Sequence, residues 1–429
     1  MHRYSAKDAD TKHYERHPID QSREGKTLKP NRFRIIFVPL GSCLGHLSRN
    51  DALAREIKRR VPDTETVFVA GGLTYEAAKK WRLNVFEVPE DASQNLLNQW
   101  FKTARKKSEG ASSRIFFSLF LSFCFNGLLR WVKLRSLVRS FKPDVIVADG
   151  EYPVLGFCRI QKIPCVFMTN DLMPAVPTAL GDKWVKRIQP SLDRVIAHFL
   201  RWGKITIIPD YPGTTRVPAE IDVTFTGPIL KIRAETVPDR EAVRKKMKLE
   251  SGERMILVTG SGTGAGPELI HTAIAAFKKT REAEPKARMI VKYWPSLSDE
   301  EASRYSGISG LELARFVPDL FEYMVACDLI VTHSGHTTLM EAALAGVPII
   351  TTPYAGQMEQ EANARRMEAV GGAVVIRSDE LTAGSLASSI ISLLRDEKKR
   401  LEMASINKRF VETQGASKAA ELVLELLRS

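Results

Sequence analysis

The chain alternates apolar, strand-like runs with helical stretches, and this alternation, present in both halves, constrains the fold more than any other feature of the sequence. Such an order is typical of parallel sheets covered by helices. Buried strands are expected over 33–40, 64–71, 144–150 and 164–170, at the start of 254–279, and over 287–294, 329–335, 347–353 and 372–378.

The alternation breaks near residues 224–240, where a glycine–proline turn and a polar stretch occur. One hydrophobic core rarely serves a chain of 429 residues, so two domains are expected. We predict an α/β protein with two Rossmann-like parallel-sheet domains that face a cleft at the carboxyl ends of their strands. The predicted parts are a disordered tail over 1–31, an N-terminal domain over 32–230, a C-terminal domain over 231–410 and a helix over 411–429 that could pack back on the N-terminal domain.

The formal net charge of +13 suggests an anionic partner, and the charge is unevenly distributed. Residues 102–142 contain ten lysines and arginines against one acidic residue, and they enclose the apolar segment 115–129. Basic flanks around a block of phenylalanine and leucine favour an anionic membrane surface over nucleic acid, whose grooves interleave aromatic side chains with cations. The apolar span is too short to cross a bilayer, which takes about 20 residues. A buried helix packed on the sheet is the alternative.

Two loops that follow strands carry candidate ligand-binding residues, because ligands bind at the carboxyl ends of parallel strands. In the first, Gly41 and Gly45 allow a tight turn, and His46 stands at the start of a helix, where it can act as a general base or cap the helix. The second loop, 259–266, has four glycines and small hydroxyls whose backbone N–H groups could hold a phosphate. It lacks the ending of a Walker motif, so a flexible turn is the alternative.

A third loop and its helix, 332–345, combine donors for a phosphate with an acceptor for hydroxyl groups. The free N–H groups at the helix start near Thr337 suit a diphosphate. One turn further on, Glu341 would repel phosphate but could accept hydrogen bonds from the vicinal hydroxyls of a ribose. An exposed helical glutamate is the alternative, which its apolar neighbours disfavour. The next loop brings Glu359 and Gln360 to the same level, where a carboxylate and an amide suit sugar hydroxyls.

The stretch HSGHTTLMEAALAGVPIITTPYAGQMEQEANA, followed by two glycines and a strand, resembles the donor site of glycosyltransferases with the GT-B fold. It is most similar to the group of the MurG-type N-acetylglucosaminyltransferases, the monogalactosyldiacylglycerol synthases and related archaeal-type enzymes. The similarity is strong over 315–378 and looser over 33–60, 143–170 and 224–266. The first loop departs from the MurG pattern, and residues 149–151 resemble the archaeal-type group more closely than MurG.

The resemblance implies roles for individual residues. Glu341 resembles the glutamate that binds ribose, and His46 matches the loop histidine proposed as the base. Lys231 stands where such enzymes often carry an arginine near the diphosphate. The segment that lines uracil and the pair that contacts the donor sugar are matched by Phe316–Val317 and by Glu359–Gln360. The residues implied to hold the diphosphate and the nucleoside are Ser261, Gly262, Thr263, His333, Ser334, Gly335, His336, Thr337 and Thr338.

These features predict a glycosyltransferase that moves N-acetylglucosamine or a hexose from a UDP-sugar to a lipid-linked or membrane-associated acceptor. His46 would deprotonate the acceptor hydroxyl, the family implies inversion at the anomeric carbon, and no metal or cofactor is needed if backbone dipoles stabilise the departing diphosphate. An enzyme like UDP-N-acetylglucosamine 2-epimerase and a non-catalytic nucleotide-sugar-binding protein are the alternatives. Five scattered cysteines and 32 leading residues without an apolar run favour a cytoplasmic protein at the inner face of the membrane, with no nucleic-acid partner.

Overall fold

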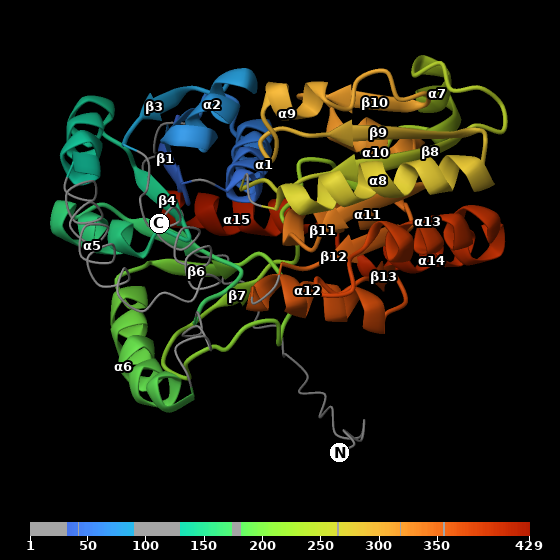
Figure 1. Cartoon of the computed structure of the whole chain (residues 1–429). Helices are drawn as coiled ribbons and strands as arrows, with labels where there is room; N and C mark the ends of the chain where they lie inside the picture. Colours follow the sequence, from blue (N-terminus) through green and yellow to red (C-terminus); the bar gives the residue numbers. More distant parts are fainter. Residues whose placement is uncertain are drawn as a thin grey trace.

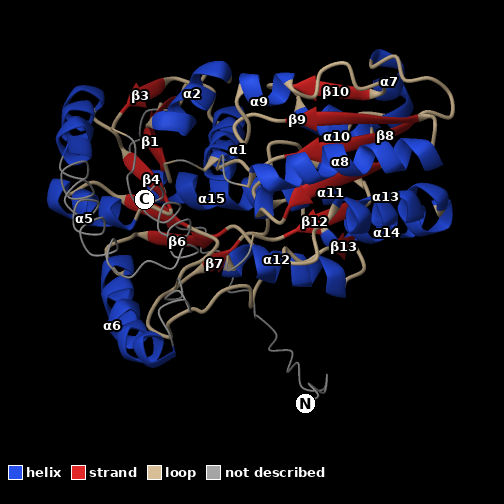
Figure 2. Ribbon diagram, in the orientation of Figure 1, coloured by secondary structure: helices blue, strands red, loops and turns tan. Residues whose placement is uncertain are grey.

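The computed structural model describes residues 32–41, 43–89, 129–173, 182–263, 266–317, 319–354 and 357–429. The predicted tail over 1–31 and most of the predicted membrane segment, residues 102–128, lie outside these ranges. The described residues form two parallel β-sheets that lie side by side, each covered by helices (Figures 1 and 2). This arrangement confirms the predicted α/β fold with two parallel-sheet domains.

The N-terminal sheet has the strand order β3-β2-β1-β4-β5-β6-β7, and its neighbouring strands pair in parallel. Its central strands are continuous apolar runs, as expected where helices cover both faces of a sheet. The strands are β1 Arg34–Pro39, β2 Glu65–Ala70, β3 Val85–Glu87, β4 Val145–Asp149, β5 Cys165–Met168, β6 Ile205–Ile208 and β7 Thr224–Phe225. The helices are α1 Leu44–Arg60, α2 Gly72–Lys80, α5 Tyr152–Gln161 and α6 Asp182–Leu200, and residues 129–141 are also helical.

The C-terminal sheet has the order β10-β9-β8-β11-β12-β13, again with parallel neighbours. Its strands are β8 Arg254–Thr259, β9 Ala287–Lys292, β10 Leu311–Ala314, β11 Leu329–His333, β12 Ile349–Thr352 and β13 Ala373–Val375. Its helices are α7 Arg240–Lys246, α8 Pro267–Ala283, α9 Asp299–Ser303, α10 Leu320–Ala326, α11 His336–Ala345, α12 Met358–Ala369, α13 Ala383–Arg395 and α14 Glu397–Phe410, with a 3₁₀ turn at Ala234–Thr236. The order of each sheet reverses direction beside β1 or β8, so the loops after these strands stand at the switch points where ligands bind.

The last helix, α15 Gly415–Arg428, packs on the N-terminal sheet rather than on the sheet that precedes it in the chain. Its buried stripe, Ala419, Ala420, Val423, Leu424 and Leu427, joins the same core as residues of β1 and α1. A stripe at this spacing is the apolar face of an amphipathic helix. The helix therefore ties the end of the chain to the N-terminal domain, and Figure 1 shows it beside α1.

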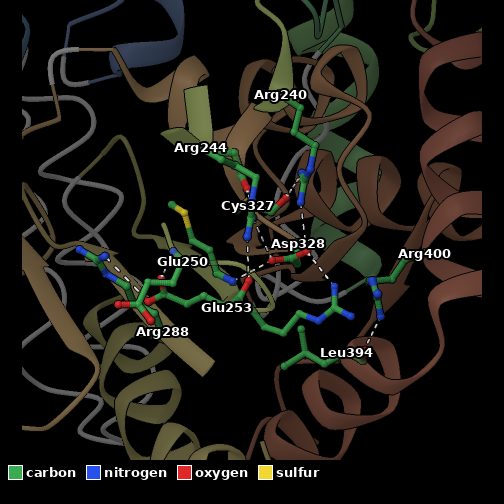
Figure 3. Close-up of polar contacts among 12 residues, drawn as sticks. Arg240, Arg244, Glu250, Glu253, Arg288, Cys327, Asp328, Leu394 and Arg400 are labelled. Carbon is green, nitrogen blue, oxygen red and sulfur yellow. Dashed lines mark hydrogen bonds and ion pairs between the residues drawn. The ribbon is translucent and has the colours of Figure 1, made fainter. Parts of the chain in front are cut away.

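Charged groups at the amino end of the C-terminal sheet serve packing. Asp328, just before β11, accepts hydrogen bonds from the Met255 backbone N–H at 2.8 Å and from Arg240 and Arg244 at 3.0 and 3.3 Å (Figure 3). Arg240 also donates to the Val325 carbonyl oxygen at 2.9 Å, at the end of α10. These contacts join α7, α10, β8 and β11, so the polar groups at this end of the sheet are paired with one another within the chain.

Among the described helices, none combines the length and the apolarity that a bilayer span requires.

Candidate functional site

The carboxyl end of the N-terminal sheet places His46 beside Asp149. The helix α1 begins at Leu44, so Gly45 and His46 lie in its first turn and Gly41 lies in the turn before it. Asp149 ends β4, the neighbour of β1. The His46 Nδ1 and Asp149 Oδ1 atoms are 2.8 Å apart.

Two further residues of α1 hold the Asp149 carboxylate. Arg49 Nε donates to Asp149 Oδ2 at 2.6 Å, a second guanidinium nitrogen contacts Oδ1, and Asn50 Nδ2 donates to Oδ2 at 2.6 Å. Burial opposes the charge of Asp149, but Arg49 and His46 outweigh it and lower the pKa of the carboxyl to about 2. Asp149 is therefore an ionised, acceptor-only group at neutral pH.

The residue after Asp149 must be small for His46 to reach its place. Gly150 has φ +73°, and a Cβ atom there would lie 3.3 Å from His46 Cε1. Sequence reasoning noted Asp149 without finding its role, because 103 residues separate it from His46. An Asp-Gly pair at the end of a buried strand is the signal that could have found it.

The strand-end loops of the two domains meet at a junction. The Leu44 backbone N–H donates to the Gly262 carbonyl oxygen at 3.3 Å. The Thr337 Oγ1 atom lies 3.1 Å from the position that a Cβ would take at Gly45. The structure thus brings three predicted elements together: the 41–46 turn, the 259–263 loop and the start of α11.

The start of α11 is open. Its N-cap residue is Gly335, so no capping side chain accepts a hydrogen bond from the first backbone N–H groups of the helix. A Cβ atom built on Gly335 would have no atom of the described residues within 4 Å. Thr337 and Thr338 are half-buried beside it. Backbone N–H groups at such a helix end attract anions, so this position suits a phosphate.

The neighbouring side chains at positions 333, 334 and 336 are occupied by protein partners. His333 is buried: its Nδ1 atom lies 2.9 Å from the Thr352 carbonyl oxygen and its ring stacks on Tyr354 at 4.0 Å. Burial lowers the pKa of His333, so its imidazole brings no positive charge to a phosphate. Ser334 is buried, with its hydroxyl 2.9 Å from that of Thr351. These side chains hold the turn in shape, so the groups that the turn offers to a phosphate are its backbone N–H groups.

His336 connects the two domains. Its Nε2 atom lies 3.4 Å from Asp210 Oδ2, and Arg366 Nη1 donates to Asp210 Oδ1 at 2.9 Å. Asp210 follows β6 of the N-terminal sheet, whereas His336 and Arg366 belong to α11 and α12. The contact fixes the first turn of α11 against the other domain.

Glu341 lies one turn along α11 with its charge incompletely compensated. Burial raises the pKa of its carboxyl to about 7, with the Lys231 charge opposing this and the Asp319 charge adding to it. Lys231 Nζ lies 3.0 Å from Asp51 Oδ2 on α1 and 3.4 Å from the centre of the Trp81 ring. Lys231 is therefore anchored to the N-terminal domain, within electrostatic reach of Glu341.

The loop after β8 and the segment after β10 border the same region. Ser261 is buried and its Oγ accepts from the Thr263 backbone N–H at 3.1 Å, which closes a tight turn. Phe316 is half-buried, Val317 is buried, and the Phe316 ring lies 6.3 Å from that of Trp294 in an edge-on arrangement.

Of the two residues expected to contact the donor sugar, Gln360 is buried and Glu359 is exposed. Gln360 is buried, and its Oε1 atom accepts from the Tyr354 backbone N–H at 3.2 Å. Glu359 is exposed and faces the N-terminal domain: after burial, its charge is the largest influence that raises the pKa of both Cys43 and Asp171. Glu359 thus lies across the junction from the His46 turn.

Comparisons with known proteins agree with this geometry. Residues 255–423 match the model of the glycosyltransferase family 28 C-terminal domain. The chain is 25% identical over 404 residues to the UDP-N-acetylglucosamine–N-acetylmuramyl-(pentapeptide) pyrophosphoryl-undecaprenol N-acetylglucosamine transferase of Acetivibrio thermocellus, covering 92% of this chain and 98% of that protein. It is 29% identical over 292 residues to an uncharacterized glycosyltransferase of Methanopyrus kandleri, covering 67% and 77% of the two chains.

Solved structures show the same fold. The glycosyltransferase of kitacinnamycin superposes with a TM-score of 0.62 at 19% identity, over 93% of this chain and all of that one. MurG of Acinetobacter baumannii superposes with a TM-score of 0.57 at 15% identity, over 92% and 99% of the two chains. The predicted resemblance to MurG-like GT-B glycosyltransferases is confirmed.

Proposed function

We propose that this chain, a MurG-like glycosyltransferase of the GT-B fold with a family 28 C-terminal domain, moves N-acetylglucosamine or a related hexose from a UDP-sugar to a hydroxyl of a lipid-linked acceptor. The single observation that carries the proposal is the meeting of two half-sites at the domain junction. One holds His46 against an ionised aspartate, and the other presents the open start of α11 with Glu341 one turn along.

The proposed donor site lies along α11, with the diphosphate at the start of the helix and the ribose one turn further on. The diphosphate lies against the backbone N–H groups at Gly335, Thr337 and Thr338, where the helix dipole favours negative charge. Glu341 accepts hydrogen bonds from the ribose hydroxyls, which supply the polar partners that its half-buried carboxylate needs. The ribose therefore stabilises the Glu341 carboxylate, whose charge burial disfavours in the free protein.

The proposed base is His46. The Nδ1 atom lies 2.8 Å from Asp149 Oδ1 and 2.7 Å from Arg49 Nη2. Because the Asp149 carboxylate is acceptor-only, we assign the Nδ1 proton to the bond with Asp149, which leaves the Nε2 lone pair for the acceptor hydroxyl. In one displacement, the acceptor oxygen bonds to the anomeric carbon, the bond from that carbon to the diphosphate oxygen breaks, and the hydroxyl proton moves to Nε2. Attack from the face opposite to the leaving group inverts the anomeric carbon.

The departing diphosphate gains negative charge. In this proposal that charge is stabilised by the start of α11, the 260–263 turn and Lys231. Among the described residues, no group of three or more histidine, cysteine, aspartate or glutamate side chains is arranged to hold a metal ion. We expect the rate of transfer to be unchanged after treatment with EDTA. A rate that falls with EDTA and returns with a divalent cation would contradict the metal-independent form of the proposal.

The acceptor would arrive from a membrane. The helix 129–141, α5 and α6 share one core layer on the N-terminal sheet and expose Val132, Ile160 and Val195 on their outer faces. Exposed cations lie near these side chains in the sequence: Lys133, Arg135, Arg139, Arg159, Lys162 and Arg194. Apolar side chains among cations suit the surface of an anionic bilayer, so we place the enzyme at the inner face of the cell membrane.

The direct test incubates the protein with a panel of radiolabelled UDP-sugars and a membrane lipid extract. We expect one label to enter the organic phase, and UDP release to require the lipid. UDP release or sugar isomerisation from the nucleotide sugar alone would favour an epimerase or a hydrolase. UDP binding without transfer to any lipid would favour a nucleotide-sugar-binding protein. The His46→Gln variant is the matched control, since it keeps the donor half-site.

A further inference from the structure

Lys292 is a buried lysine that the proposed mechanism does not use. It ends β9, level in the sheet with Thr259 of β8 and Ala314 of β10, and its residue is 8% exposed. Within the described part of the chain its ammonium donates to the Trp294 carbonyl oxygen at 2.8 Å, and to no other acceptor. An ammonium has three N–H donors, and a buried charge without its full set of partners is costly.

The charged neighbour of Lys292 is a second lysine, from the other domain. Burial and then the charge of Lys80 lower the pKa of Lys292 to about 8. Lys80 ends α2, and its Nζ atom lies 4.0 Å from the Trp294 ring centre and 5.5 Å from that of Phe316. Neither lysine forms a salt bridge with a described residue. Two cations converge here without an acid between them.

Trp294 anchors this cluster at the domain junction. Its side chain packs against the core of α8 and β9 and also against the core of α1 and α15. The rings of Trp294 and Phe316 therefore form an aromatic wall that both domains support, with the two ammonium groups beside it. An aromatic wall with adjacent hydrogen-bond donors suits a planar, acceptor-rich ring.

The cluster borders the segment before α10, which also carries a residue that acts on Glu341. The segment that carries Phe316 continues to Asp319, whose charge acts on Glu341. A nucleoside whose ribose lies at Glu341 can therefore extend its base toward Phe316 and the two lysines. An ammonium donates to a carbonyl oxygen but meets only another donor in an exocyclic amino group.

We propose that Lys80 and Lys292 hold the 4-keto oxygen of the donor's nucleobase and so select a keto pyrimidine, such as uracil, over an amino pyrimidine, such as cytosine. This inference rests on the proposed function and extends it to base recognition by both domains. UDP and CDP differ at positions 3 and 4 of the ring: uracil has an N3–H donor and an O4 acceptor, whereas cytosine has an N3 acceptor and an N4 amino donor. An ammonium therefore favours UDP over CDP only where it meets O4. Because Lys80 comes from the N-terminal domain, the correct base also bridges the two domains.

The test measures UDP and CDP dissociation constants by calorimetry for the full chain and for the Lys292→Met and Lys80→Met variants. The matched control is Lys79→Met, which removes an exposed neighbour on α2 that lies over Tyr75 instead. We expect the wild type to favour UDP by roughly 10–100-fold, as expected when a buried donor loses its acceptor. Lys292→Met should remove the preference by weakening UDP alone, Lys80→Met should reduce it, and Lys79→Met should keep it.

A preference for UDP that survives both variants overturns the inference, as does an equal loss of UDP and CDP affinity, which would place the lysines at the shared diphosphate. Because Lys80 is exposed, its variant tests the inference even if Lys292→Met fails to fold. A wild type that binds neither nucleotide instead overturns the proposed function, and the inference with it.

Discussion

The carboxyl ends of the two sheets differ in how their charges are compensated. In the N-terminal domain, Asp149 is fully buried, holds a pKa of about 2 and bonds to Arg49, His46 and Asn50. In the C-terminal domain, Glu341 has a pKa raised to about 7, and the start of α11 is open. Paired charges fix a catalytic group in place before substrate arrives, whereas unpaired groups gain their partners from the ligand.

The amino end of the C-terminal sheet sharpens this contrast. There Asp328 bonds to Arg240, Arg244 and the Met255 backbone, although no site is proposed at that end. Asp328, which serves packing alone, is therefore compensated by described partners. The incompletely compensated Glu341 and Lys292 both lie at the domain junction, which is the pattern expected of groups that wait for a ligand.

The largest expected effect separates catalysis from binding. The His46→Gln variant should lose transfer activity by about 10²–10⁴-fold, the usual contribution of a general base. Its UDP affinity should stay within about twofold, because the described hydrogen-bond partners of the His46 imidazole, Asp149 and Arg49, belong to the N-terminal half-site. Activity is followed as label transferred to lipid, and UDP affinity by calorimetry. A His46→Gln enzyme that transfers at the wild-type rate would remove the assignment of His46 as base.

The next effect concerns the paired half-site. Asp149→Asn leaves the Arg49 guanidinium buried beside a neutral amide, and should lower the free energy of unfolding by about 3–5 kcal/mol at pH 7. The pKa of Asp149 is lowered from 3.8 to about 2, so its contribution is present above pH 3.8 and is lost as pH falls toward 2. Urea unfolding of both proteins at pH 7 and pH 3 measures it. An unchanged midpoint at pH 7 would show that the network stabilises nothing.

The opposite sign is expected at the unpaired half-site. The pKa of Glu341 is raised from 4.5 to about 7, so the wild type loses stability as pH rises through this window. At pH 8 the free energy of unfolding of Glu341→Gln, measured with urea, should therefore exceed that of the wild type by roughly 1–3 kcal/mol. At pH 4 the two proteins should be equally stable. The comparison fails if Glu341→Gln is destabilising at pH 8, as Asp149→Asn is.

The smallest effect is at the surface proposed to meet the membrane. Arg135→Glu with Arg139→Glu should weaken binding to anionic vesicles by about 1 kcal/mol or more per cation, and the loss should shrink at high salt. Lys278→Glu with Lys279→Glu on α8 is the charge-matched control, expected to bind as the wild type does. Equal binding of all three proteins in vesicle sedimentation would remove this surface from the proposal.

The sequence predicted the strands that carry continuous apolar runs, including the short β13, and it missed β3, β7 and β10. These strands have two to four residues and are only partly buried, so no alternating or continuous apolar pattern marks them. β6, which pairs with β7 near one edge of its sheet, was also missed, because its four residues are too few to separate from the end of α6.

The candidate site was predicted where one local stretch carries it, as at Gly335 and Glu341. It was missed where the fold joins distant residues: Asp149 meets His46 across 103 positions, and Lys292 meets Lys80 across the domain junction. A lysine at the end of an apolar strand, as in ARMIVK, is the local signal that could have drawn attention to Lys292. Its partner could not be read from the sequence.

The most direct measurement is the calorimetric titration of UDP into the wild type, Glu341→Ala and His46→Gln. The account predicts that UDP binds the wild type and His46→Gln alike, whereas Glu341→Ala binds about 10–100-fold more weakly, as expected when a site loses its partner for a hydroxyl pair. If UDP does not bind the wild type, or binds Glu341→Ala equally well, then the helix α11 does not hold the nucleotide and the account is wrong.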